Sequence, residues 1–225
     1  MLLFLFLAKV SIVNHQRGQS MFEIFLFINP IGIYCYDTEK QIRNTVDELG
    51  IDVWYHYISI ANVCLVNDDA IRRRKDSQKL PDISTFSKAT YEALENYHAI
   101  KLKYGNKKAR EFLYELQKNL SHDASAYNPK LLEKIATKLN IKTSTINSMK
   151  ESSYVRSSIE EDQKLANEWN IKATPTIVLF NEDNEQNGVL LEGPIAHGDL
   201  VNLLLPDYQN CFSNFMPQQN HLRLI

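Results

Sequence analysis

The segment that most restricts the fold is a strand, a tight turn and a helix between Phe22 and Gly50. Phe22 to Ile28 is a run of β-branched and aromatic residues, typical of a central parallel strand that is covered on both faces. Asn29-Pro30 ends the strand, and a helix with one apolar stripe follows from Tyr36 to Gly50. A second apolar run, Asp52 to Ile60, predicts a right-handed βαβ unit with parallel strands.

Composition and charge exclude several classes of protein. The chain has 225 residues, of which 44% are hydrophobic, enough for one domain with an insertion or for two small domains. Its net charge is −2 with both signs interspersed, so we expect no nucleic-acid partner and no membrane partner. The three cysteines, Cys35, Cys64 and Cys211, are too far apart for a disulfide framework or a zinc site. They are typical of a reducing compartment, where thiols stay free.

Residues 1–20 are expected to be an extension in front of the domain. Leu2 to Ala8 is apolar but far too short to span a membrane, and no positive charge precedes it, so the match to a signal peptide is poor. The interpretation that fits better is a misassigned start codon, with Met21, directly before the first strand, as the true start. A signal peptide is the alternative.

A long helical insertion is predicted between the βαβ unit and the C-terminal elements. Asn67 to Pro81 is polar and is expected to be a loop, whose basic run, Arg72 to Lys75, is either a solvated surface or a docking patch for an acidic partner. From Ile83 to Trp169 the apolar residues recur with a helical period. We expect a break at Gly105-Asn106, a helix start at Asn128-Pro129 and another at Ser157 or Ser158. The predicted segments are an extension (1–20), the first half of a sheet domain (21–66), the loop and insertion (67–155), the second half of the domain (156–205) and a tail (206–225).

The second half of the domain contains a proline at the start of a strand. Thr174-Pro175-Thr176 leads into the apolar strand Val178 to Phe180, and proline belongs at a strand start because it cannot donate to a ladder. Gly188 to Glu192 is expected to pair antiparallel with that strand. Asp199 to Leu205 then forms a closing helix.

The strand–helix corner resembles the active-site corner of the DsbA-like branch of the thioredoxin superfamily. In that branch the corner carries Cys-Pro-x-Cys, then Tyr or Trp, and then Glu three residues after the aromatic residue. Gly32 to Glu39 fits this frame, except that Gly32 stands in the place of the first cysteine, while Cys35 stands in the place of the second.

The proline loop resembles the same branch. Ile171 to Thr176 is similar to the loop that carries the family's cis-proline, which is Pro175 in this chain. The resemblance covers about residues 21–205 and implies an α/β thioredoxin-like fold with an all-helical insertion, in which Thr174 and Pro175 face the corner.

The resemblance also implies what the corner can no longer do. In working relatives the first cysteine is the nucleophile and the second resolves the mixed disulfide. Gly32 has no side chain to replace the nucleophile, so Cys35 is either a buried small hydrophobe or a single redox-sensing thiol. In another register, Cys35 to Thr38 forms a monothiol Cys-x-x-Thr site after a turn three residues longer. Cys64 can meet Cys35 only if the fold brings the two within disulfide reach.

Within this branch, the stretch Phe22 to Ile42 (FEIFLFINPIGIYCYDTEKQI) is similar to the SpxH (YjbH) family. These proteins are cytoplasmic adaptors of low-GC Gram-positive bacteria, which bind the transcription regulator Spx and promote its degradation by the ClpXP protease in the stress response. The resemblance implies a cytoplasmic adaptor with no enzymatic activity and no cofactor. One alternative is a DsbA-family thiol-disulfide oxidoreductase or isomerase with a degenerate, single-cysteine site, and another is a glutathione transferase of the kappa type.

Three surfaces are candidates for partner binding: the corner from Asn29 to Tyr36, the Thr174-Pro175 loop and the basic run. Trp54 and His56 lie in a predicted central strand and are expected in the core. No carboxylate or cysteine at metal-ligand spacing accompanies the remaining candidate ligands, which are His98, His122 and His197.

Overall fold

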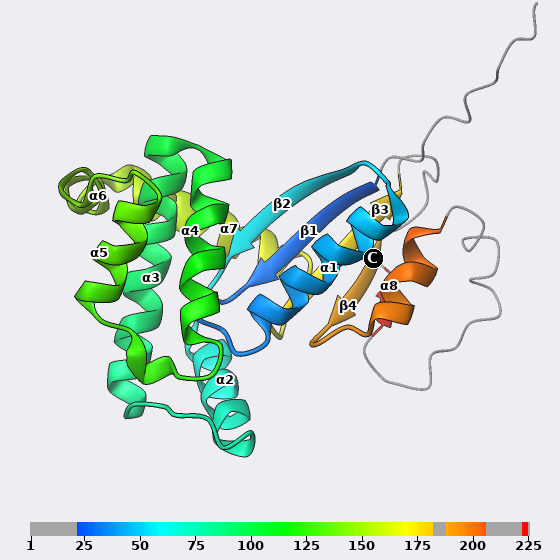
Figure 1. The fold of residues 1–225 in the computed structure, drawn as a ribbon, viewed down its shortest axis with the longest axis horizontal. Helices are drawn as coiled ribbons and strands as arrows, with labels where there is room; N and C mark the ends of the chain where they lie inside the picture. The colour runs from blue at the N-terminus through cyan, green and yellow to red at the C-terminus, as the bar shows by residue number, and fades with distance from the viewer. Residues whose placement is uncertain (1–21, 182–187, 206–221, 225) are drawn as a thin grey trace, which may run out of the picture.

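The computed structural model describes residues 22–181, 188–205 and 222–224. Within these ranges the sheet has five strands in the order β2-β1-β3-β4-β5, and helices cover both of its faces (Figure 1). The elements in chain order are β1 (Phe22–Ile28), α1 (Cys35–Leu49), β2 (Val53–Ser59), α2 (Val63–Lys75), α3 (Ile83–Tyr104), α4 (Asn106–Leu120), the 3₁₀ turn η1 (Ala124–Ala126), α5 (Pro129–Lys138), α6 (Thr143–Lys150), α7 (Ser153–Glu168), β3 (Thr176–Asn181), β4 (Val189–Glu192), α8 (His197–Leu204) and β5 (Leu222–Leu224).

The predicted βαβ unit is present. β1 and β2 pair in parallel, with Phe22 opposite Val53, and α1 connects them. α1 ends at Gly50, whose positive φ of 61° is a left-handed conformation that glycine adopts without strain. β3 pairs antiparallel with β1 and β4 pairs antiparallel with β3, so the C-terminal strands join the sheet as predicted.

The apolar side chains of β1 divide between two cores. Ile24 and Leu26 belong to the larger core, which lies beneath α1 and α8 and continues without a break into the helical insertion. Phe27 points to the other face, where α7 and Trp169 cover a smaller core. Burial of each large apolar side chain contributes about 1.5–3 kcal/mol. Because one core spans the sheet and the insertion, the two are stabilised together.

The helices of the insertion follow the predicted breaks with one exception. Gly105 separates α3 from α4, and Asn128 caps α5, as predicted. α7 begins at Ser153, whereas the sequence predicts a start near Ser158. The first turn of α7 has one buried apolar residue, Val155, beside Tyr154, which is 72% exposed, so an apolar period does not reveal this turn.

α2 occupies most of the predicted loop 67–81, and this prediction was wrong. The side chain of Asn62 caps the helix, but its buried face includes Asp69 and Arg73, which interrupt the apolar stripe. The basic run 72–75 forms the last turn, where positive charge is favourable beside the helix C-terminus.

Trp54 and His56 are not in the core, contrary to the prediction. β2 is the outermost strand on its side of the described sheet, and an apolar run in the sequence does not show whether a strand is central or at an edge. Trp54 is 58% exposed. His56 is partly exposed, and its Nε2 lies 2.7 Å from Glu23 Oε1.

The predicted tail contributes a strand: Leu222–Leu224 forms β5, antiparallel to β4. The other residues of the tail, including Cys211, lie outside the described residues, as does the predicted extension 1–20. In the part of the chain that the structure describes, no helix is long and apolar enough to cross a membrane.

Candidate functional site

The candidate site is the turn between β1 and α1. Asn29 shapes it, because its backbone carbonyl accepts a hydrogen bond from Gly32 N–H at 3.0 Å and its side-chain oxygen accepts one from Ile31 N–H at 3.1 Å. α1 begins at Cys35 itself. The alternative Cys-x-x-Thr register, in which Cys35 follows a longer turn, stays a prediction.

The thiol of Cys35 is buried and stays protonated. Cys35 is 0% exposed. Burial raises the pKa of the thiol far above its ordinary value, and the nearby charge of Asp69 raises it further. A hydrogen bond to the backbone of Asn29 and the positive charge of Arg73 lower this pKa, but desolvation outweighs both. At neutral pH, Cys35 is a packed apolar side chain and a poor nucleophile.

Gly32 is also buried, and its α-carbon faces the thiol of Cys35. A Cβ atom added at Gly32 would lie 2.7 Å from Cys35 Sγ and 3.0 Å from Asn29 Cβ. In a disulfide, the Cβ of one cysteine lies roughly 3 Å from the sulfur of the other, given an S–S bond of about 2.05 Å. The corner thus keeps the spacing of a Cys-x-x-Cys site and lacks one sulfur.

The proline loop contacts α2. The Thr174-Pro175 peptide bond is cis, as the family resemblance implies. The backbone carbonyl of Thr174 accepts a hydrogen bond from Arg72 Nη1 at 2.9 Å, and the other Nη of Arg72 pairs with Asp68 at 2.6 Å. A peptide that approached this carbonyl would have to displace the Arg72 guanidinium.

Arg73 holds the corner through hydrogen bonds from a buried guanidinium. Its side chain is 0% exposed and donates to the carbonyl oxygens of Ile31 at 2.7 Å and Leu120 at 3.1 Å. It also donates to Asp69 Oδ2 at 3.1 Å, while Asp69 Oδ1 accepts from Ile33 N–H at 2.7 Å. Burial raises the pKa of Asp69, and the positive charge of Arg73 opposes that shift. Such a pair is stable in the interior because its hydrogen bonds are satisfied.

A third residue of the α2 region, Asp76, also contacts the corner. Tyr34 precedes α1 and donates its hydroxyl to Asp76 Oδ2 at 2.6 Å, at the C-terminal end of α2. That hydrogen bond raises the pKa of Tyr34. α2 therefore holds the backbone on both sides of Gly32, the tyrosine before Cys35 and the proline loop.

This role of α2 is not among the sequence predictions. The available signal was the spacing of Asp69 and Arg73, since residues four apart lie on one face of a helix and pair there. Because the segment is predicted to be a loop, this helical spacing carries no weight in the sequence prediction. The candidate docking patch is consequently divided: Arg72 and Arg73 serve the fold, while Arg74 and the lysine after it are exposed.

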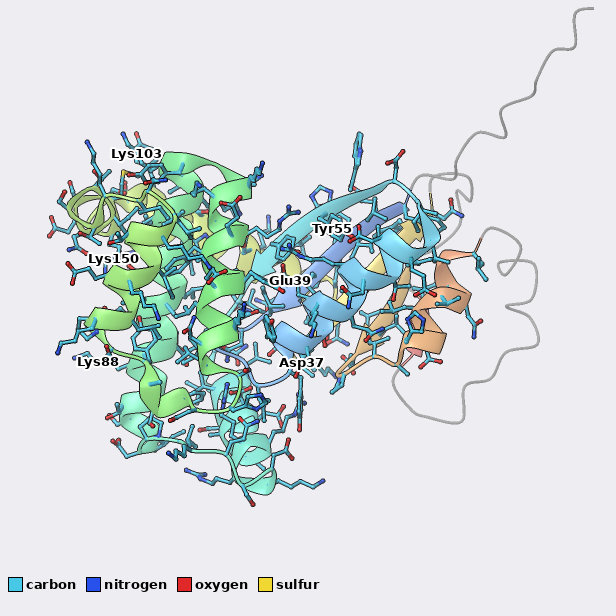
Figure 2. All side chains as sticks on the ribbon, in the orientation of Figure 1. Asp37, Glu39, Tyr55, Lys88, Lys103 and Lys150 are labelled. Carbon is cyan, nitrogen blue, oxygen red and sulfur yellow. The ribbon has the colours of Figure 1, made fainter. Side chains whose placement is uncertain are left out.

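Glu39, the glutamate of the family frame, has a structural environment. It lies in the first turns of α1 together with Asp37 (Figure 2). Glu39 is 1% exposed, pairs with Arg43 and accepts a hydrogen bond from the Tyr57 hydroxyl at 2.9 Å. Burial raises the pKa of its carboxyl. The residue links α1 to β2 and does not reach the thiol site by any of these contacts.

The remaining candidates do not join the corner. Cys64 is exposed at the start of α2, and both it and Cys35 are free thiols. His98 is buried in the insertion beside Ser158, and His197 lies near Glu48. Among the described residues, no group of three potential ligands could hold a metal ion.

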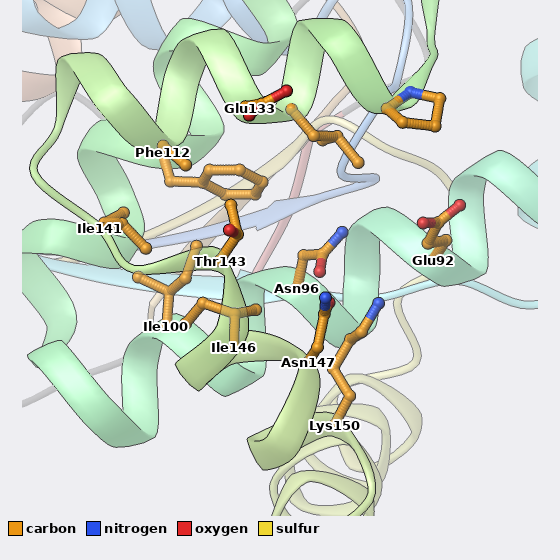
Figure 3. A pocket seen from close by; sticks show the side chains of 13 residues that line it. Glu92, Asn96, Ile100, Phe112, Glu133, Ile141, Thr143, Ile146, Asn147 and Lys150 are labelled. Atoms are coloured by element: carbon orange, nitrogen blue, oxygen red, sulfur yellow. The ribbon is translucent and has the colours of Figure 1, made fainter.

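A separate pocket of about 290 Å³ lies inside the helical insertion (Figure 3). Ile100 and Phe112 are among its apolar lining residues, and Glu92, Glu133 and Lys150 are its charged ones. None of the corner residues lines it, so this pocket is separate from the corner.

Comparisons with known proteins agree with this geometry. A family model described as thioredoxin matches residues 25–197. No curated protein matches the chain. Among solved structures, a thioredoxin-like oxidoreductase from Silicibacter pomeroyi is 15% identical with a TM-score of 0.53, covering 87% of this chain and 88% of that one.

Two further solved structures are similar. The thiol-disulfide exchange protein alpha-DsbA2 of Wolbachia pipientis is 11% identical with a TM-score of 0.51, covering 84% of this chain and 82% of its own. The oxidoreductase DsbA of Xylella fastidiosa is 13% identical with a TM-score of 0.51, covering 86% of each chain. At these identities the likeness shows the fold. The chain therefore belongs to the thioredoxin superfamily and has the DsbA-like fold with a helical insertion.

Proposed function

We propose that this chain is a non-catalytic member of its family: a cytoplasmic adaptor that binds Spx and promotes its degradation by ClpXP. The observation that carries the non-catalytic part is Gly32, which stands where the nucleophilic cysteine of a dithiol site belongs. The choice of Spx rests on the similarity of residues 22–42 to the SpxH family.

The chemistry of the corner supports a role without catalysis. A dithiol cycle oxidises or reduces a pair of sulfur atoms, and this corner has one. The single thiol of Cys35 is fully buried, and its raised pKa keeps it protonated. The Thr174 carbonyl already accepts a hydrogen bond from Arg72. Each of these three features opposes attack on a substrate disulfide.

The same features suit a fixed binding surface. The hydrogen bonds from α2 hold the corner in one conformation, which lowers the entropy that a partner's binding would otherwise remove. Because the backbone from Asn29 to Ile33 is buried, the accessible side chains there are the half-buried Tyr34 and Tyr36 and the exposed Asp37. These three are the corner residues that we expect to contact Spx.

The decisive experiment is the half-life of purified Spx in the presence of ClpXP, with and without this protein. We expect the half-life to shorten, and to shorten equally with the Cys35→Ser variant, because the buried thiol takes no part. A substrate of ClpXP that needs no adaptor serves as the control and should be degraded at an unchanged rate. An unchanged Spx half-life with the folded protein would refute the adaptor role.

The comparisons favour a second candidate, a thiol-disulfide oxidoreductase or isomerase that works through Cys35 alone. The similar solved structures carry such names. This function would require glutathione or another thiol to supply the second sulfur. Reduction of a glutathione mixed disulfide, compared between the wild type and Cys35→Ser, tests it. Activity that disappears in Cys35→Ser would establish this function in place of the adaptor without catalysis.

A further inference from the structure

β2 is an edge strand whose own sequence carries none of the usual protective residues. It closes one side of the described sheet, and its sequence, VWYHYIS, contains no lysine, proline or glycine. Edge strands normally carry such residues, because exposed N–H and C=O groups recruit other strands. A long aromatic edge of this kind is therefore a surface that a partner is expected to cover.

The ladder shows which backbone groups of β2 face outward. In a parallel pair, alternate residues direct both their N–H and C=O to the neighbouring strand. Asp52 accepts from Phe22 N–H at 3.4 Å and Ile60 donates to the Ile28 carbonyl at 2.9 Å, so the even-numbered residues of β2 face β1. The odd-numbered residues, Val53, Tyr55, Tyr57 and Ser59, consequently direct theirs away from the sheet.

The helical insertion covers only half of this edge. Tyr97 donates its hydroxyl to the Tyr57 carbonyl at 2.9 Å, and Ser59 N–H donates to Asp162 Oδ2 at 3.2 Å. These two contacts satisfy the C-terminal part of the edge. Val53 and Tyr55 lie before them, on the side where no further described strand pairs with β2.

A positively charged pocket of about 290 Å³ adjoins the same edge. Its lining on β2 includes Tyr55 and Tyr57, which both contribute to the larger core beneath α1. Figure 2 shows Tyr55 on the α1 side of β2. Three cations line it from α3 and α4, and they are Lys101, Lys107 and Arg110. No residue named in this lining is an acid.

Two of these cations are only partly neutralised by the protein. Lys107 has no carboxylate partner within the described ranges. Arg110 lies over the rings of Tyr55 and Tyr57, and its charge lowers the pKa of the Glu39 carboxyl, but its buried Nε has no hydrogen-bond partner among the described groups. Lys101 is paired with Asp162. Charge complementarity therefore favours an acidic occupant.

We propose that the free half of the β2 edge, together with this pocket, is the docking site for an extended acidic segment of a partner protein. The segment adds a strand outside β2 through the backbone groups of Val53 and Tyr55. Its carboxylates meet Lys107 and Arg110. A second copy of this chain fits less well, because pairing two β2 edges would bring two positive pockets together. The inference goes beyond the proposed function and does not depend on Spx or ClpXP.

The test uses the full chain and a fluorescein-labelled peptide of alternating glutamate and valine, with binding followed by fluorescence anisotropy. We expect this peptide to bind more tightly than one of alternating lysine and valine, and to bind more weakly as salt is raised. Methylation of those peptide backbone nitrogens that would face β2 should weaken binding by about tenfold, since it removes the N–H groups that donate to the β2 carbonyls. The protein itself is unchanged in this comparison, so folding does not confound it.

Two exposed lysines provide a matched pair of variants. Lys107→Glu should weaken the acidic peptide roughly three- to tenfold, whereas Lys103→Glu, on α3 outside the pocket, should leave it unchanged. Equal binding of acidic and basic peptides, indifference to backbone methylation, or equal losses in both variants would overturn the proposal. Sedimentation experiments provide a further check. A dimer that becomes more stable with Lys107→Glu would also overturn the proposal, because the occupant of the edge would then be a second copy of this chain.

Discussion

Removal of the Arg73 guanidinium should destabilise the fold far more than removal of a neighbouring positive charge. Arg73→Met keeps much of the aliphatic side chain but deletes donors to Ile31, Leu120 and Asp69. It also leaves the buried carboxylate of Asp69 without its counter-ion. Breaking a buried ion pair by removing one partner typically costs about 3–5 kcal/mol. For a protein of this size, that loss lowers Tm by roughly 6–20 °C.

Urea denaturation of the wild type and Arg73→Met at neutral pH measures the effect, and Arg74→Met is the matched control. Arg74 is exposed on the same helix, so its substitution should change the free energy of unfolding by about 0.5 kcal/mol or less. The double variant Asp69→Asn/Arg73→Met should recover part of the loss, since no unpaired charge stays buried. Alkylation of Cys35, followed by peptide mass spectrometry, should accelerate in Arg73→Met as the corner loosens.

The reasoning would be refuted by a loss below about 1 kcal/mol in Arg73→Met, or by an equal loss in Arg74→Met. The first result would mean that the guanidinium contributes little to holding the corner, and the second that the loss is not specific to the buried hydrogen bonds of Arg73.

Three further predictions concern the thiol, a buried histidine and the two tryptophans. Gly32→Cys should form a disulfide with Cys35 in oxidised glutathione, because a Cβ at this position lies 2.7 Å from the existing sulfur; a mass measurement that finds both thiols still reduced would contradict this. Burial and the charge of Lys101 lower the pKa of His98 from 6.5 to about 4, so the unfolded chain binds the proton first and stability rises with pH between these values. Over this range the free energy of unfolding of the wild type should rise by roughly 3 kcal/mol because of His98 alone. In urea titrations from pH 4 to 7, the free energy of unfolding of His98→Gln should lack this part of the rise. Trp54→Ala should change stability by about 0.5 kcal/mol or less, whereas Trp169→Ala should cost about 3–5 kcal/mol, because Trp169 packs on three phenylalanine rings; similar losses in thermal melts would disprove the exposure of the Trp54 side chain.

Local sequence signals predicted the parts of the fold that depend on neighbouring residues. The apolar run of β1, the end of α1 at Gly50 and the proline before β3 each follow from backbone preferences within a few residues. The strand order does not: β2 lies at an edge because β3 takes the other side of β1, and no local pattern in β2 records that choice. For this reason the sequence pattern predicts Trp54 in the core, although its side chain is exposed.

The sequence predicts the corner residues of the candidate site but not the contacts of α2 that hold them. Gly32 and Cys35 were placed correctly at the corner because the motif is contiguous in sequence. The bond from Arg72 to Thr174 joins residues 102 positions apart, and that from Arg73 to Ile31 joins residues 42 apart. Polar contacts between residues so far apart in the sequence leave no periodic signal. In α2 the residues that make them, Asp69 and Arg73, also interrupt the apolar stripe that would have predicted a helix.

The bonds of Arg73 have a consequence for motion. One guanidinium reaches Ile31, in the sheet half of the molecule, and Leu120, in the insertion, so a hinge between the two halves would have to break a fully buried network. Lys101 and Asp162 add a second link beside β2, since Asp162 binds both that lysine and Ser59. The two halves should therefore move as a rigid body, without the domain closure by which many clefts admit their ligands. A segment that docks between β2 and α4 would enter a groove whose walls are already in place.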